Sequence, residues 1–247
     1  MFKKIEVRFA MKKNFLILVS VLFFVSCNEK QAVRKMQRME EGVANPTTIE
    51  EYKDAIEKYQ KRVYDIESAN SQIGIWYKIL GSRYLDQKMY GEALKCYEAA
   101  LQYYPANQNL FYYVGLCAGY MSHASLDFNA GGSIEKKMNY LKLSESAYLQ
   151  AIALESRYVR ALYGLGVLYV FELDESEKAI PYLEKLLQID TGHTDAKFVL
   201  ANAYYRTGQT QKSADLYDNI AKTTKDKTKK KAAEENKKQI LDADYVQ

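Results

Sequence analysis

The chain has 247 residues, 27% of them charged, and a formal net charge of +4. A net charge this small for the length implies no obligatory nucleic-acid partner. The length allows a sizeable hydrophobic core, and tyrosine, with 22 residues, is the compositional outlier.

Residues 11–27 have the features of a bacterial export signal. Two lysines precede an apolar run from Phe15 to Val25, which is too short for an ordinary membrane span. Ser26 and Cys27 follow, and a small residue before a cysteine resembles the processing site of bacterial lipoproteins. The resemblance implies a start at Met11 and a lipid on Cys27, which anchors the protein on the exported side, periplasmic or surface, of a membrane of the bacterial cell envelope. The alternative is an uncleaved N-terminal anchor helix.

Residues 28–46 are polar and charged without apolar periodicity, so we interpret them as a tether. Residues 47–73 begin like a helix, because Thr48 and Glu51 have the spacing of a capping box. Apolar residues then recur at helical spacing, at Ile49, Tyr52, Ala55, Ile56, Tyr59 and Val63. We predict one long helix that packs beneath the helices after it as an N-terminal cap.

Residues 74–107 contain two predicted helices separated by a turn. Each helix has one apolar face, formed by Tyr77, Leu80, Tyr84, Tyr97 and Leu101. Gly81 and Ala93 are small, as the close crossing of two antiparallel helices requires. Gly91 suits the turn, and Pro105 ends the second helix. The pattern resembles the tetratricopeptide repeat (TPR), a helix–turn–helix unit of about 34 residues.

One such helix pair cannot bury a core alone, so further copies are expected. The sequence contains three, over residues 108–158, 159–193 and 194–222, in which Gly81 recurs as Gly115, Gly166 and Ala201. The first of them has an insertion at about 121–138. The next is one residue longer than the repeat, and we place this extra residue in the turn Glu172–Glu175.

Residues 223–247 are rich in lysine and suit the polar capping helix or tail that a repeat array needs. The alternative is an electrostatic contact with anionic lipid or another polyanion. The resemblance thus implies an all-α fold, a TPR superhelix (an α-solenoid of antiparallel helix pairs) with N- and C-terminal capping helices.

The sequence contains no pattern of residues that indicates catalysis or metal binding. His123 and His193 are the only histidines, and neither has Cys or carboxylates at metal-ligand spacing. We therefore predict neither an enzyme nor any cofactor besides the covalent lipid on Cys27. Cys96 and Cys117 lie within predicted packed helices and are expected to be buried free thiols, although export would permit a disulfide.

In TPR proteins the first helix of each repeat lines a concave groove. Carried over by register, this implies a groove of aromatic, cationic and amide residues: Lys78, Asn109, Tyr112, Tyr120, Arg160, Tyr163, Phe171, Phe198, Asn202, Tyr205 and Arg206. The family's clamp for a peptide C-terminal carboxylate is incomplete, because Ser82, Tyr113 and Gly164 replace three of its residues. The alternative for each aromatic residue is packing against neighbouring helices.

These features predict a non-enzymatic, lipid-anchored scaffold that binds protein or peptide partners in a bacterial envelope assembly. The alternative is an accessory subunit of a transporter that depends on a periplasmic solute-binding protein; its marks would be a closed, apolar pore or pocket and oligomerisation about it. The insertion at 121–138 is hypothesised to extend the two helices of its repeat and to fold over one edge of the groove. The oligomeric state stays open.

Overall fold

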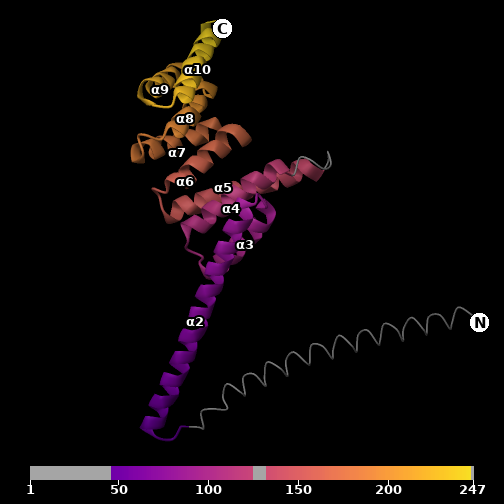
Figure 1. The fold of residues 1–247 in the computed structure, drawn as a ribbon, viewed down its shortest axis with the longest axis vertical. Coiled ribbons are helices and arrows are strands. Elements are labelled where there is room, and N and C mark those ends of the chain that lie inside the picture. The colour runs from indigo at the N-terminus through magenta and orange to yellow at the C-terminus, as the bar shows by residue number, and fades with distance from the viewer. Residues whose placement is uncertain (1–45, 125–131, 246–247) are drawn as a thin grey trace, which may run out of the picture. The chain divides into compact units, whose positions relative to one another are not determined.

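The computed structural model describes residues 46–124 and 132–245 (Figure 1). The predicted signal peptide with Cys27, nearly all of the predicted tether and the middle of the insertion lie outside these residues. Within them every regular element is a helix: α2 (Ile49–Asp86), α3 (Tyr90–Tyr103), α4 (Gln108–Ala124), α5 (Gly132–Leu154), α6 (Val159–Val167), the π-helical turn η1 (Leu168–Glu172), α7 (Ser176–Ile189), α8 (Thr194–Arg206), α9 (Thr210–Thr223) and α10 (Lys227–Tyr245). No helix among the described residues has both the length and the hydrophobicity required to cross a membrane.

Helix α2 begins at the predicted capping box. The Thr48 hydroxyl accepts a hydrogen bond from the Glu51 amide at 3.2 Å, and the Glu51 carboxylate accepts one from the Thr48 amide at 3.1 Å. Hydrogen bonds that the Glu51 carboxylate accepts from Thr47 and from the Thr48 amide lower the pKa of Glu51. The helix continues without a break through residue 73, where we expected the cap to end and the first repeat to begin. Packing of the 47–73 segment beneath the repeats stays a prediction.

The chain divides into two compact units, the first ending at Ile66 and the second beginning at Glu67. In the second unit, helices that are adjacent in sequence pack against each other in turn, from α3 to α10. Each helix pair buries its apolar faces against the next pair, as a solenoid requires. α4 and α5, with 17 and 23 residues, are longer than α3, α7, α8 and α9, as the hypothesis of an insertion that extends both helices expected.

Small residues lie where the two helices of a repeat cross, as predicted. A Cβ atom added to Gly81 would lie 3.0 Å from the Tyr97 ring, and one added to Gly115 would lie 2.8 Å from the Tyr148 ring. A Cβ added to Gly166 would lie 2.5 Å from Leu183. Contacts this short require the facing side chain or the helix to shift, so the glycines allow the two helices to pack closely.

Three turns between paired helices share one geometry, with a left-handed residue in the middle. Its φ is 59° at Lys88, 54° at Asp174 and 74° at Gly208. In each turn the small residue of the following helix lies five positions after the left-handed residue. These small residues are Ala93, Ala179 and Ser213, in turn order. We expected Gly91 to form the turn, and this prediction is wrong. Gly91 lies inside α3, and Lys88 takes the left-handed conformation of the turn.

The extra residue of the third copy also lies elsewhere than expected. Asp174 follows Gly166 by eight residues, whereas Lys88 follows Gly81 by seven. The amide after the left-handed residue, that of Glu175, donates to the carbonyl of Tyr169 six residues earlier, whereas the bonds of Met89 and Gln209 span five. The additional residue is accommodated with η1, where the Leu173 amide donates to the Leu168 carbonyl five residues earlier. A π-helical turn is the geometry that absorbs one inserted residue inside a helix.

Helix α10 ends the array by packing on α9. Its buried residues Ala233 and Ile240 join Tyr217 and Ile220 in one apolar cluster, and Lys237 pairs with Asp218 of α9 at 2.9 Å. Most lysines at the start of α10 point into solvent. One apolar face and one charged face are what a capping helix requires.

Candidate partner-binding pocket

The second unit contains an aromatic pocket formed by α4, α5, α6 and η1. Its volume is about 280 Å³. The pocket is lined by Tyr112, Leu116, Gly119, Tyr120, His123, Ser144, Tyr148, Arg160, Tyr163, Gly164, Val167, Leu168 and Glu172. It lies between the first helices of the second and third repeats, where the TPR resemblance places a groove.

The floor of the pocket is Tyr148 of α5, which glycines contact from two sides. A Cβ atom on Gly115 would lie 2.8 Å from its ring, and one on Gly164 would lie 2.6 Å from Cζ. The Ser144 hydroxyl, one turn earlier, donates to the Gly115 carbonyl at 2.8 Å. Burial raises the pKa of Tyr148, so the floor is a neutral phenol at physiological pH.

One wall combines tyrosines in edge-to-face and tilted contact with a guanidinium group. Tyr112 contacts the rings of Tyr113, Tyr148 and Tyr158 with centroid distances of 5.2, 6.0 and 5.9 Å. The exposed Arg160 guanidinium lies 6.0 Å from the centroid of the Tyr112 ring, and burial raises the pKa of Tyr112. The wall therefore presents a cation on a rigid aromatic surface.

Another part of the lining is ionic. The Glu172 carboxylate at the end of η1 lies 3.2 Å from Nε2 of His123 and 3.6 Å from Nζ of Lys137. Glu172 is half-buried, whereas the His123 side chain is largely exposed. This part of the pocket can accept a hydrogen bond from a ligand, while Arg160 can only donate one.

The structure brings four of the predicted groove residues together in this pocket: Tyr112, Tyr120, Arg160 and Tyr163. The others lie elsewhere or have partners within the protein. Phe198 packs on Tyr217, and Asn109 accepts a hydrogen bond from the Tyr158 hydroxyl at 2.7 Å. Asn202 is half-buried, and its Oδ1 atom is buried without a hydrogen-bond partner. Lys78 and Tyr205 are exposed on α2 and α8. A binding role for the eleven residues stays a prediction.

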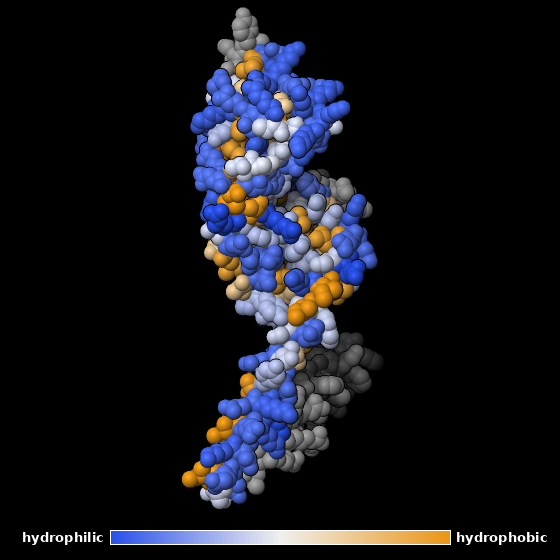
Figure 2. Space-filling view, turned by 60° about the vertical axis from the view of Figure 1, so that its left-hand side comes forward, coloured by the Kyte–Doolittle hydropathy of each residue, from blue (hydrophilic) through white to orange (hydrophobic). Residues whose placement is uncertain are grey.

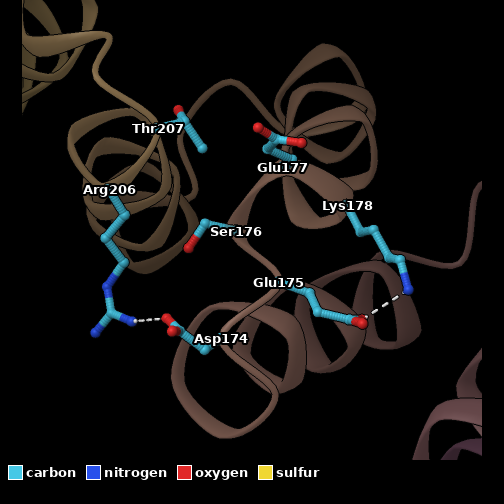
Figure 3. A pocket seen from close by; sticks show the side chains of 7 residues that line it. All are labelled: Asp174, Glu175, Ser176, Glu177, Lys178, Arg206 and Thr207. Atoms are coloured by element: carbon cyan, nitrogen blue, oxygen red, sulfur yellow. Dashed lines mark hydrogen bonds and ion pairs between the residues drawn. The ribbon is translucent and has the colours of Figure 1, made fainter.

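Phe171 and Arg206 meet each other outside the pocket. Figure 3 shows Arg206, at the end of α8, pointing at Asp174 beside a second cavity of about 350 Å³. Its Nη1 atom donates to Asp174 and to the Val170 carbonyl, both at 2.9 Å, and its guanidinium lies 5.8 Å from the centroid of the Phe171 ring. Arg206 thus stabilises the π-helical turn.

Sequence reasoning missed His123, Ser144, Tyr148 and Glu172 as pocket residues. His123 lies on the α4 face of Leu116 and Tyr120, so extending that face by one turn identifies it. No sequence signal identifies Glu172, because its approach to His123 depends on the π-helical turn. Among the described residues, no three His, Cys, Asp or Glu side chains are grouped so as to hold a metal ion.

The buried thiols are as expected. Cys96 and Cys117 are both free and buried. Burial raises the pKa of Cys117 to about 12, so this thiol is uncharged and unreactive in the folded protein.

Comparison with known proteins supports the repeat assignment. Residues 75–107, 141–194 and 171–229 match the tetratricopeptide repeat family. A TPR repeat-containing protein of Borreliella burgdorferi is 23% identical over 212 residues, which cover 83% of this chain and 90% of that protein.

Three solved structures share the fold. A tetratricopeptide repeat protein from Parabacteroides merdae has a TM-score of 0.56 at 16% identity, covering 70% of this chain and 61% of its own. YrrB, described as a TPR protein with an unusual peptide-binding site, has a TM-score of 0.52 at 20% identity, covering 72% and 88%. MamA has a TM-score of 0.51 at 19% identity, covering 78% and 99%. The chain therefore contains tetratricopeptide repeats, and its fold is the all-α solenoid of TPR proteins.

Proposed function

We propose that this protein is a non-enzymatic, lipid-anchored TPR scaffold that binds a protein or peptide partner in a bacterial envelope assembly. The observation behind the proposal is the pocket between α4 and α6, in which a guanidinium group lies on a tyrosine wall. The description of YrrB as a peptide-binding TPR protein supports a protein-interaction role for this fold.

The pocket chemistry fits a peptide segment with an apolar and an acidic side chain. Tyrosine rings supply a large contact area at a small entropy cost, because they have few rotatable bonds. Arg160 is exposed beside them and suits a partner carboxylate, with which a guanidinium forms two parallel hydrogen bonds. Glu172 suits a backbone amide or a basic group of the same segment.

The anchor part of the proposal is supported by the sequence of residues 11–27. An apolar run behind two lysines, ending in Ser26 and Cys27, is the arrangement of a lipoprotein signal. Two acyl chains on one cysteine hold a protein stably at a membrane. The folded part then lies on the exported side, where envelope partners are accessible.

The transporter alternative is less well supported. It expects a closed, apolar pocket for a small ligand, whereas this pocket is lined by Arg160, His123 and Glu172 together with tyrosines. Charged groups in the wall favour a partner that carries its own hydrogen-bonding groups.

The test is chemical crosslinking of the full-length protein in its own membranes, followed by mass spectrometry. The variant Arg160→Glu reverses the charge on the pocket wall, and Arg157→Glu makes the same change three residues away, outside the pocket. Loss of a charge-assisted contact is expected to weaken partner capture about tenfold or more in Arg160→Glu. Arg157→Glu is expected to capture the same partners as the unmodified chain.

Equal capture by both variants would show that the pocket is not the binding surface. Capture of a periplasmic solute-binding protein in an Arg160-dependent manner would favour the transporter alternative. Circular dichroism of both variants checks that each remains folded. The anchor is tested separately: Cys27→Ser is expected to move the protein out of the membrane fraction without changing its helix content.

A further inference from the structure

The apolar residues of α2 ahead of the repeats follow a heptad pattern. Successive residues are separated alternately by three and four positions, at Ile49, Tyr52, Ile56, Tyr59, Val63 and Ile66. Alternating steps of three and four residues give the 3.5-residue period of a coiled-coil seam, in which two positions of each heptad are apolar. A helix packed in a globular core has instead a wider apolar face with a period of 3.6 residues. In heptad notation, Ile49, Ile56 and Val63 occupy position a.

These side chains are exposed in the single chain. The exposed fractions are 70% for Ile49, 57% for Ile56 and 54% for Val63, and Tyr52 and Ile66 are also more than half exposed. Figure 2 shows hydrophobic residues, in orange, along one edge of α2. A continuous apolar stripe of this length on a helix marks an interaction surface.

The same seam continues toward the repeats, where the chain partly covers position a but leaves Leu80, at position d, 43% exposed. Position a is occupied next by Asn70, then by Tyr77 and Tyr84, and both tyrosines pack against the cluster of α3 and α4. Tyr77 stacks on Tyr103 of α3 at a centroid distance of 6.2 Å. The portion of the seam ahead of the first partly covered tyrosine is Ile49–Asn70, about three heptads.

Two features indicate that the occupant is a second copy of this chain. Asn70 is a single polar residue at position a, and such a residue fixes register by hydrogen bonding to the same residue of an identical helix. Position g of one heptad faces position e of the next heptad on the partner, which places Arg62 opposite Glu67 of the second copy. The remaining g–e pairs of the segment bring no like charges together.

We propose that Ile49–Asn70 forms a parallel, in-register, two-stranded coiled coil with the same segment of a second copy. The dimer would join two aromatic pockets, so that a partner with two binding segments is held more tightly than by either pocket alone. The coiled coil itself does not depend on the function proposed for the pocket.

The test is disulfide crosslinking of the full-length chain in its membranes. Ile56→Cys and Val63→Cys place thiols at two successive a positions, and Ser68→Cys places one at the outward position f. In a parallel, in-register pair, each a position lies opposite the same residue of the second copy, within the Cα separation of about 7 Å that a disulfide requires. Both variants are therefore expected to form about tenfold more dimer than Ser68→Cys. The unmodified chain, whose Cys96 and Cys117 are buried, gives the background.

Dimer yields no higher than those of Ser68→Cys would overturn the proposal. Crosslinking at only one of the two a positions would also overturn the proposal. In an antiparallel pair, at most one of the two positions can lie opposite the same residue of the second copy. A crosslinked product that contains a different protein would show that the seam has another occupant. Sedimentation of the detergent-solubilised full chain provides a measurement without cysteines. Val63→Glu is expected to convert a dimer to a monomer, and Ser68→Glu is expected to remain dimeric; a trimeric unmodified chain would exclude the two-stranded form.

Discussion

The glycine at the crossing of α4 and α5 offers a sharp test of how the repeats pack, because the same helix contains a matched control. Gly115 and Gly119 lie four residues apart in the interior of α4. Replacing either by alanine gains about 1 kcal/mol of helix propensity. The two positions differ in what the new methyl group would contact.

At Gly115 the Cβ atom would lie 2.8 Å from two atoms of the Tyr148 ring, whereas at Gly119 it would lie 3.7 Å from the Ser144 hydroxyl, an ordinary contact. Tyr148 has little room to move away from Gly115, because it is almost fully buried and its Cε1 atom also lies close to Gly164. Overpacking of this kind costs about 1–3 kcal/mol. Gly115→Ala should therefore be less stable than Gly119→Ala by about 1–3 kcal/mol, since the propensity gain cancels in the comparison.

The assay is thermal unfolding of the full chain in one detergent, followed by circular dichroism at a helical wavelength. For a folded unit of this size, about 1 kcal/mol shifts the midpoint by about 2–4 °C, so the two variants should differ by about 2–12 °C. Gly119→Ala is expected to unfold at or above the temperature of the unmodified chain. Equal midpoints for the two variants would refute the reasoning that Gly115 allows the two helices to pack closely.

Three further predictions concern the turns and a buried tyrosine. Lys88→Gly should raise stability by about 1 kcal/mol, and Gly208→Ala should lower it by a similar amount, because only glycine takes positive φ without strain; urea unfolding that gives both changes the same sign would contradict this. Arg206→Met should destabilise the chain by about 1–3 kcal/mol because it leaves the Val170 carbonyl without its donor, and an unchanged urea midpoint would show that the π-helical turn does not need it. Burial raises the pKa of Tyr97 to about 12 from an ordinary value of 10, so the folded state holds a proton that the unfolded state loses. The free energy of unfolding should fall as pH rises from about 10 to 12. In thermal scans at a series of pH values, the unfolding midpoint of Tyr97→Phe should fall less with pH over that range than the midpoint of the unmodified chain.

The sequence alone determined the repeat architecture. The fold class follows from spacing along the chain: an apolar face on each helix, and Gly81, Gly115 and Gly166 where the helices cross. The capping box at Thr48 and Glu51 and the end of α3 before Pro105 are equally local. These features are predictable because helix faces, caps and stops depend on residues within a few turns of one another.

Only the tertiary structure decided the details of the turns. Lys88 and Asp174 adopt positive φ although neither is glycine, since packing of the paired helices fixes the turn and overrides the local preference. The extra residue of the third repeat is absorbed in a π-helical turn, whose Val170 carbonyl accepts a hydrogen bond from Arg206 of the next repeat. Arg206 and Val170 are 36 residues apart in the sequence, so the residues around Val170 do not predict this contact.

The pocket has the same origin. Register along α4 and α6 places Tyr112, Arg160 and Tyr163 on the predicted face, but it does not distinguish them from Phe198, which lies outside the pocket and packs on Tyr217. That distinction depends on how far each neighbouring helix covers the face, and the approach of Glu172 to His123 depends on the inserted residue in η1. Helical periodicity determines which way a side chain points, whereas the atoms it meets are determined by helices packed from other parts of the chain.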